Sequence, residues 1–499
     1  MKEMNFPLLS AQEAARLIKD KKVLGIGGFS SVGTPKLVPM ALAEYAKELH
    51  SEGKEFKVGL ITGGAAGSLI DGALAQADAV FMRTPFQSDK DMRNSINSGK
   101  VAYFDLHLSH IGQDVRYGFL PKIDVAIIEA SDITAEGEIT LSTSVGISPT
   151  LVQQADRVIV ELNRVHKGKL KGMHDIFLLD NPPYRKEIPI YRVNDRVGSC
   201  TLKVDPKKIV AVVESEVKDR IAPFTPLNET TQRIGNNVAA FLLNEWRKGG
   251  IPKEFLPLQS GVGNVANAVL GTLGEDTHLP AFSMFTEVIQ NSVIDLMMKE
   301  RISFATGSSL TLSEDKLDMM YENLDFFKDR ILLRPQEITN HPEMVRRLGI
   351  IAVNTALEAD IFGNVNSTHV MGSKMMNGIG GSADFSRNAF LSIFTTPSTA
   401  KDGLISSIVP QVSHVDSTEH DVRVLVTEQG VADLRGKSPK ERAACIIENC
   451  AHPDYKELLW DYVKLSEGKG YHTPFSLKNA LKMHLAFAET GDMRNTKYE

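Results

Sequence analysis

The stretch Val23-Leu24-Gly25-Ile26-Gly27-Gly28 decides the class of fold that the sequence predicts. It joins a short apolar run to a glycine-rich turn. Thr34-Pro35 then predicts a helix N-cap followed by proline at the first helical position. Apolar residues recur at helical spacing from Leu37 to Leu49, which indicates a helix that buries one face. The stretch therefore predicts a strand, a turn and a helix, the repeating unit of α/β proteins.

The same alternation continues along the chain. Short runs rich in β-branched residues, typical of strands in parallel sheets, occur at Val125–Ile128, Val158–Val160, Ile209–Val213, Ile350–Val353 and Val422–Val426. Longer helical patterns separate them, and Ser438-Pro439-Lys440-Glu441 predicts the start of another helix. We predict an α/β fold with mostly parallel sheets.

The two halves of the sequence share residues at a nearly constant separation. One block holds four identities, each 224 positions apart (286 minus 62, for example): Thr62, Ser68, Ile70 and Asp71 match Thr286, Ser292, Ile294 and Asp295. Further blocks follow in the same order, which indicates an internal duplication. The helical periodicity breaks around residues 221–227. We therefore predict two related α/β domains, residues 1–225 and 226–499.

Composition excludes several classes of protein. The 499 residues carry 56 Lys and Arg against 62 Asp and Glu, a net charge of −6, so we expect no general attraction to nucleic acid or to an anionic membrane. The first residues lack a signal-peptide pattern and no apolar run approaches the ~20 residues that span a bilayer, so we expect a cytoplasmic protein. Cys200, Cys445 and Cys450 are too few and too badly spaced for a disulfide framework or a four-ligand zinc site.

Glu287 stands out because the duplication places it opposite a residue of another chemical type. Its counterpart 224 positions earlier (287 minus 63) is Gly63, inside a run of small residues. A carboxylate has therefore been placed where the sister segment has no side chain. Its neighbours Phe285 and Val288 are apolar, and a carboxylate there costs desolvation energy unless it is paired or used. An ordinary surface or ion-paired glutamate is the alternative.

Two later glycine-rich stretches can approach a ligand with backbone N–H groups. Residues 261–267 form a turn between a predicted strand and helix but depart from the dinucleotide fingerprint at Asn267. Residues 376–385 contain Gly378, Gly380 and Gly381, and glycine permits close approach to a ligand. Each stretch is also compatible with an ordinary tight turn.

Together these motifs resemble the succinyl-CoA:acetate CoA-transferases, within the wider acetyl-CoA hydrolase/transferase family. The resemblance covers nearly the whole chain. Its carriers are Thr286-Glu287-Val288, Gly378-Ile379-Gly380-Gly381-Ser382-Ala383-Asp384-Phe385 and residues 28–36, 263–269, 363–369 and 427–436. It implies two related α/β domains with the active site between them, and a homodimer.

The resemblance also implies roles for individual residues. Glu287 is the expected nucleophile, Gly381 the expected oxyanion donor, and Glu428 is expected close to the nucleophile. The expected contacts of coenzyme A are Val262, Gly263, Asn264, Val265, Ala266, Asn340, Asn377, Gly381 and Lys401. We add Arg220 as a candidate for the distal carboxylate of succinate, with an ordinary surface arginine as the alternative.

The implied reaction moves coenzyme A from succinyl-CoA to acetate through a glutamyl-CoA thioester, with no metal and no tightly bound cofactor. An acyl-CoA hydrolase, in which water opens the thioester, would use the same residues. Propionate, butyrate or 4-hydroxybutyrate could replace either acid. A non-catalytic sensor of coenzyme A or sugar phosphates is the alternative of another class, and it would not require Glu287.

Overall fold

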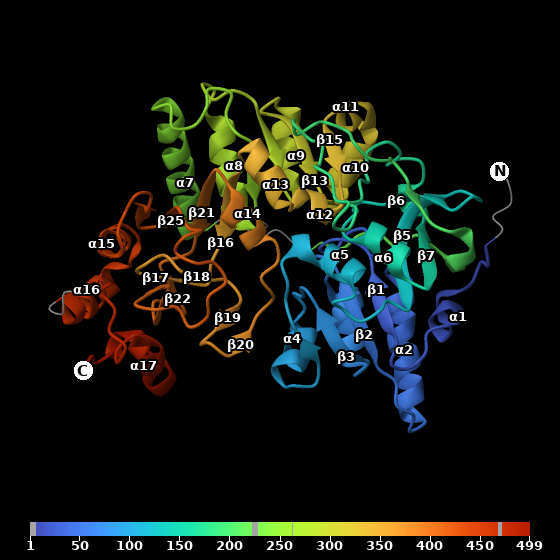
Figure 1. Cartoon of the computed structure of the whole chain (residues 1–499), viewed down its shortest axis with the longest axis horizontal. Coiled ribbons are helices and arrows are strands. Elements are labelled where there is room, and N and C mark those ends of the chain that lie inside the picture. The colour runs from blue at the N-terminus through green and yellow to red at the C-terminus, as the bar shows by residue number, and fades with distance from the viewer. Residues whose placement is uncertain (1–5, 222–227, 262, 468–471) are drawn as a thin grey trace. The chain divides into compact units, whose positions relative to one another are not determined.

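The structure is a computed structural model, and it describes residues 6–221, 228–261, 263–467 and 472–499 (Figure 1). Packing divides the chain into two compact units. Unit 1 comprises Met1–Ala222, Ser283–Leu348 and Asn377–Asp384, and unit 2 comprises Pro223–Phe282, Gly349–Met376 and Phe385–Glu499. The predicted boundary at residue 225 lies outside the described residues, and the division into 1–225 and 226–499 stays a prediction.

The two units differ from that prediction because two later segments, Asn377–Asp384 and Ser283–Leu348, group with unit 1. Backbone hydrogen bonds explain this grouping. The N–H of Leu310 donates to the carbonyl of Thr143 over 2.8 Å, and the N–H of Gln336 donates to the carbonyl of Gly146 over 3.0 Å. Glu287 therefore belongs to unit 1, although the sequence division assigned it to the C-terminal domain.

The elements of unit 1 come from both halves of the sequence. Before the first unit boundary they are α1 (Ala11–Arg16), β1 (Val23–Ile26), α2 (Leu37–Ser51), β2 (Val58–Thr62), α3 (Ala73–Gln76), β3 (Val80–Thr84), α4 (Lys90–Asn97), β4 (Ala102–Tyr103), α5 (Leu108–Tyr117), β5 (Val125–Ile133), β6 (Glu138–Leu141), α6 (Ser148–Gln154), β7 (Arg157–Asn163), β8 (Leu202–Lys203) and β9 (Ile209–Ser215). The later ones are β11 (Phe282–Phe285), β12 (Val288–Gln290), α9 (Asn291–Met298), β13 (Ile302–Gly307), β14 (Ser309–Thr311), α10 (Glu314–Glu322), α11 (Leu324–Lys328), β15 (Ile331–Leu333), α12 (Gln336–Thr339) and α13 (Pro342–Leu348).

Unit 2 contains the remaining elements. They are α7 (Glu229–Arg247), β10 (Leu258–Ser260), α8 (Asn264–Glu275), β16 (Ile351–Thr355), β17 (Glu358–Asp360), β18 (Val365–Asn366), β19 (His369–Val370), β20 (Lys374–Met375), α14 (Ser382–Asn388, which begins in unit 1), β21 (Leu391–Thr395), β22 (Thr399–Ala400), β23 (Ile405–Ser406), β24 (Ile408–Val409), β25 (Val424–Thr427), β26 (Gly430–Asp433), α15 (Pro439–Cys450), α16 (Pro453–Glu467) and α17 (Lys482–Thr490).

The main sheet of unit 1 is largely parallel. Its order is β4-β3-β2-β1-β5, after which β5 pairs with both β6 and β7, and β7 pairs with β9. The pairs of β5 with β6 and of β6 with β8 are antiparallel. Buried side chains of α1 and α2, such as Ala14 and Leu42, form one core with Leu24 and Leu60 of the sheet. The predicted α/β fold with mostly parallel sheets is confirmed.

The order of the strands matches the predicted duplication. In unit 1 the parallel series β1-β5-β7-β9 has the same order as the parallel series β10-β16-β21-β25 of unit 2. Likewise β4-β3-β2 has its counterpart in β15-β13-β11. Strands β2 and β11 therefore correspond, and these are the strands that precede Gly63 and Glu287.

The predicted N-cap at Thr34 is wrong. Helix α2 begins at Leu37, and its N-cap position, Lys36, makes no side-chain capping bond. The carboxylate of Glu161 accepts hydrogen bonds from the backbone N–H groups of Lys36, Leu37 and Val38 at 2.9–3.2 Å. A buried carboxylate from β7 satisfies these donors and the positive end of the helix dipole, so no local cap is needed.

The predicted helix start at Ser438 is confirmed. Ser438 is the N-cap of α15, Pro439 is its first residue, and Glu441 completes the capping box. None of the described helices is both long and apolar enough to cross a membrane.

Candidate active site

Glu287 lies in the two-residue connection between β11 and β12, after Thr286. Its carbonyl accepts hydrogen bonds from the backbone N–H groups of Ser308, over 2.7 Å, and Ser309, over 3.1 Å. The N–H of Thr286 donates to the carbonyl of Thr306 over 2.9 Å. These bonds fix the backbone on both sides of the carboxylate, so the side chain projects from a rigid base.

Apolar side chains pack around the residue that follows Glu287 in the chain. The next residue, Val288, is buried in a small cluster with Phe29 and Leu108, and Phe86 packs against it. Burial raises the pKa of Glu287 to about 7, although a hydrogen bond from Asn340 opposes the shift. A carboxylate with this pKa is poorly solvated, and it is consequently a better nucleophile than one in water.

Asn340 contacts the carboxylate directly. It is fully buried at the C-cap of α12, and its Nδ2 donates to Oε1 of Glu287 over 2.6 Å. The sequence predicted Asn340 as a contact of coenzyme A. The structure additionally places its amide on the candidate nucleophile.

Gly381 leaves no room for a side chain beside Glu287. A Cβ atom on Gly381 would lie 2.0 Å from Oε1 of Glu287 and 2.2 Å from Nδ2 of Asn340. The backbone of Gly381 therefore lies too close to the carboxylate to leave space for a side chain, so this position requires glycine. Its predicted role as an oxyanion donor stays a prediction.

Two residues of this site have no role in the sequence prediction. The carboxylate of Asp384 accepts hydrogen bonds from the N–H and hydroxyl of Ser109, over 3.0 and 2.6 Å. It also accepts a bond from Nδ2 of Asn340 over 3.3 Å. Asp384 was visible as an acid after a glycine-rich turn, but no local signal pairs it with Ser109, 275 positions away.

Glu428 lies in unit 2, directly after β25. The backbone N–H of Ser398 donates to its carboxylate over 2.9 Å, and the Ser398 hydroxyl donates a second bond. Burial alone would raise the pKa of Glu428, but these hydrogen bonds outweigh it and hold the pKa below its usual value. Glu428 is therefore ionised at neutral pH. Its predicted closeness to Glu287 stays a prediction.

The predicted contacts of coenzyme A lie on several elements. Gly263, with φ of 121°, is the N-cap of α8, and Asn264, Val265 and Ala266 form the first turn of that helix. Val262 lies outside the described residues. The φ of Gly263 suits glycine, so this turn keeps a backbone that most side chains would strain.

Asn377 and Lys401 complete this predicted set. The Oδ1 atom of Asn377 is buried and has no hydrogen-bond partner among the described residues. Lys401 is exposed in the turn after β22, and its ammonium lies 4.9 Å from the ring centroid of Phe487. Arg220 is exposed in the segment after β9. The ligand roles of all three stay predictions.

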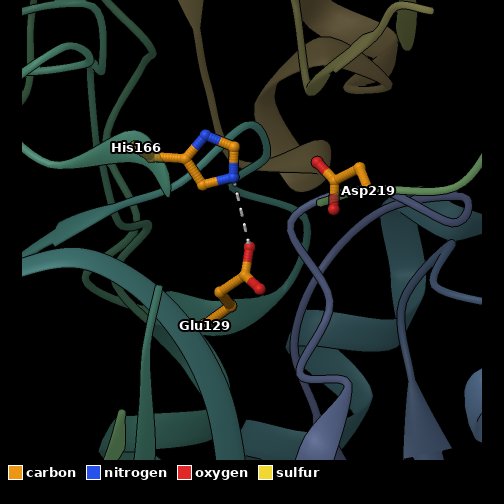
Figure 2. A group of neighbouring side chains, drawn as sticks. All are labelled: Glu129, His166 and Asp219. Atoms are coloured by element: carbon orange, nitrogen blue, oxygen red, sulfur yellow. Dashed lines mark ion pairs between the residues drawn. The ribbon is translucent and has the colours of Figure 1, made fainter. Parts of the chain in front are cut away.

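One group of possible metal ligands converges within the described residues, formed by Glu129, His166 and Asp219 (Figure 2). The ammonium of Lys36, however, lies 2.5 Å from Glu129 and 2.8 Å from Asp219. Burial alone would lower the pKa of Lys36, but the two carboxylates outweigh it and raise that pKa. A metal ion would have to displace this buried cation, so we interpret the group as a structural ion-pair cluster.

Comparisons with known protein families agree with the motifs. Residues 2–214 match the Acetyl-CoA hydrolase/transferase N-terminal domain, and residues 317–463 match the Acetyl-CoA hydrolase/transferase C-terminal domain. The chain is 49% identical over 488 residues to a succinyl-CoA:acetate CoA-transferase of Clostridium kluyveri, with 98% of this chain and 90% of the relative covered. It is 47% identical to a propanoyl-CoA:succinate CoA transferase of Escherichia coli, with 98% and 99% covered.

A relative named as a hydrolase has only slightly lower sequence identity. An acetyl-CoA hydrolase of Schizosaccharomyces pombe is 46% identical, with 95% of this chain and 94% of the relative covered. Among solved structures, RipA from Yersinia pestis aligns with a TM-score of 0.70 at 22% identity, with 92% of this chain and 98% of that chain covered. A 4-hydroxybutyrate CoA-transferase from Porphyromonas gingivalis aligns with a TM-score of 0.62 at 21% identity, with 92% and 97% covered. At these identities the structures support the fold alone.

Proposed function

Because the chain belongs to the acetyl-CoA hydrolase/transferase family, we propose that it transfers coenzyme A from succinyl-CoA to acetate through a thioester on Glu287. The resemblance in the sequence motifs to this family is confirmed, and the chain is an enzyme of the CoA-transferase type. The observation that carries the proposal is the setting of Glu287, which adjoins the buried apolar cluster of Val288 and has one amide donor and a glycine backbone beside its carboxylate.

The proposed cycle has two halves. An oxygen of the Glu287 carboxylate attacks the succinyl-CoA carbonyl, and the tetrahedral intermediate expels CoA thiolate to leave a mixed anhydride. The thiolate then attacks the glutamyl carbonyl and releases succinate, which leaves the glutamyl-CoA thioester. Acetate repeats these steps in reverse order, so acetyl-CoA leaves and the carboxylate is regenerated.

The geometry suits the first attack. The fixed backbone around Glu287 and the Asn340 amide hold the nucleophile in one orientation, which lowers the entropy lost on reaching the transition state. The apolar cluster beside Val288 limits hydration of the carboxylate. We assign the backbone of the Gly381 loop to the oxyanion, where a single donor is typically worth about 3 kcal/mol.

The finer parts of the proposal rest on the family resemblance. Residues Gly263, Asn264, Val265, Ala266, Asn377 and Lys401 bind coenzyme A, and Val262 belongs to the same turn. Arg220, which we assign from its charge and not from the resemblance, binds the distal carboxylate of succinate. The protein is a cytoplasmic homodimer that requires no bound cofactor, and propionate, butyrate or 4-hydroxybutyrate are alternative acids.

Hydrolysis of acetyl-CoA is the second candidate function, because the relative from Schizosaccharomyces pombe carries that name at 46% identity. One assay separates the two. The enzyme is incubated with succinyl-CoA with and without acetate, and acetyl-CoA and free CoA are quantified by chromatography. The transferase predicts acetyl-CoA that depends on acetate and little free CoA without it. Free CoA at the same rate in both samples would contradict the proposal and favour the hydrolase.

A further inference from the structure

The loop of residues 377–384 is hydrogen-bonded to residues 103–109 of unit 1. The hydroxyl of Tyr103 donates to the carbonyl of Asn377 over 2.6 Å, and the N–H of Ile379 donates to Asp105 over 2.8 Å. The N–H of Leu108 donates to the carbonyl of Gly380 over 3.3 Å. The last bonds in this series join Ser109 to Asp384, so the loop that brings Gly381 to Glu287 ends on a buried carboxylate.

Asp384 is held in one orientation. One carboxylate oxygen accepts from the Ser109 hydroxyl, and the other accepts from the Ser109 N–H. That second oxygen also lies 3.3 Å from Nδ2 of Asn340. Asp384 is only 4% exposed, so water does not compete strongly for these bonds.

The orientation of the Asn340 amide follows from its three partners. The Thr339 hydroxyl donates to Oδ1 over 2.9 Å, while Nδ2 donates to Glu287 over 2.6 Å and to Asp384 over 3.3 Å. An amide rotated by half a turn would place its oxygen against two carboxylates. Asp384 therefore favours the one orientation in which an N–H points to the nucleophile.

We propose that Asp384 is a positioning residue, whose Ser109-bound carboxylate orients the Asn340 amide and through it the carboxylate of Glu287. This inference rests on the proposed function of Glu287. It also predicts that the two acids influence each other's ionisation, because their charges are separated only by the shared amide. The charge of Glu287 adds to burial in raising the pKa of Asp384 to about 7, against the hydrogen bonds from Ser109.

The test compares Asp384→Asn and Ser109→Ala with the unmodified enzyme. In Asp384→Asn an NH₂ group replaces one acceptor oxygen and competes with the Asn340 donor. We expect the single-turnover rate of succinate release from succinyl-CoA to fall by about 10- to 100-fold, with KM within about threefold. Ser109→Ala removes one of the bonds that hold Asp384, and we expect a loss of about 3- to 10-fold.

A second readout does not depend on catalysis. The effect of Glu287→Gln on unfolding free energy is measured against pH, with Asp384 intact and in the Asp384→Asn background. The pH at which this effect is half complete reports the ionisation of Glu287. We expect that midpoint to be lower in the Asp384→Asn background, because the negative charge of Asp384 is absent. A merely structural role for Asp384 would leave this midpoint unchanged.

The outcomes are distinguishable. Unchanged rates and an unchanged midpoint in Asp384→Asn would overturn the inference while the function of Glu287 stands. If the unmodified enzyme forms no thioester, the proposed function fails, and the midpoint alone still decides whether Asp384 acts on Glu287. If Asp384→Asn does not fold, Ser109→Ala decides, and a wild-type rate in that variant contradicts the inference.

Discussion

The segments after β2 and β11 occupy equivalent positions in the duplicated strand order, but one carries a glycine and the other a carboxylate. After β2, Gly63 has no side chain, and a Cβ atom there would lie 2.1 Å from Oε1 of Gln336. After β11, Glu287 projects a carboxylate that meets Nδ2 of Asn340. Gln336 begins α12 and Asn340 follows that helix, so the two ends of one short helix contact the two segments.

The difference lies in what each amide binds. Gln336 accepts a bond from the N–H of Gly64 over 3.0 Å and donates one to the carbonyl of Leu108 over 2.9 Å. Those partners are backbone groups that the fold supplies, so this amide stabilises structure. Asn340 donates to two acids instead, one of them the candidate nucleophile. In the duplicated fold, the amide beside Gly63 thus stabilises the structure, whereas the amide beside Glu287 contacts the candidate nucleophile.

Removing the carboxylate should have the largest effect. Glu287→Ala makes the segment resemble its Gly63 counterpart, and we expect kcat to fall by at least about 1,000-fold because no covalent intermediate can form. Glu287→Asp should lose nearly as much, since the shorter side chain misplaces the attacking oxygen. Steady-state transfer of CoA to acetate measures both. Glu322→Ala, an exposed acid at the end of α10, is the matched control and should keep full activity.

Gly381→Ala should be the next most severe change. Its Cβ would lie 2.0 Å from the Glu287 carboxylate, so either the loop or the nucleophile must move. We expect a loss of about 100-fold in kcat with a melting temperature near that of the unmodified protein. Gly271→Ala in α8 meets no atom within 4 Å and serves as the control. Equal activity of both variants would contradict close contact at Gly381.

Substitutions of the two amides at the ends of α12, Gln336 and Asn340, should affect different properties of the protein. Asn340→Ala removes the donor to Glu287, and we expect the single-turnover rate of succinate release from succinyl-CoA to fall by about 10- to 50-fold. Gln336→Ala leaves the Gly64 N–H without its acceptor, and we expect a loss of about 1–3 kcal/mol in unfolding free energy with kcat within about threefold. Denaturant titration and single-turnover kinetics measure the pair. The reverse pattern would contradict the assignment of chemistry to one copy.

The smallest effect concerns stability and pH. The pKa of Glu287 is raised by burial from an ordinary 4.5 to about 7, so the folded state holds this proton more tightly than the unfolded state. The stabilising contribution of that proton is therefore lost as pH rises through about 7. Glu287→Gln, which does not titrate, should gain stability relative to the unmodified protein as pH rises from about 4.5 to about 7. A pH-independent difference would show that Glu287 is not desolvated.

The sequence predicted much of this site and missed part of it for physical reasons. Periodicity and β-branched runs were sufficient for the α/β fold, and the repeat singled out Glu287 because its partner Gly63 is of another type. Local patterns could not predict long-range pairs. Glu161 caps α2 across 125 positions, which made the N-cap prediction at Thr34 wrong. Asp384 and Ser109 likewise meet only because the chain folds back.

The most direct test of the central claim is to trap the intermediate. The enzyme is incubated with succinyl-CoA and no acceptor acid, treated with borohydride, digested and analysed by mass spectrometry. We predict that Glu287 alone carries an alcohol in place of its carboxylate, and that prior addition of acetate removes the modification. Transfer of CoA to acetate with Glu287 left unmodified throughout would contradict the account.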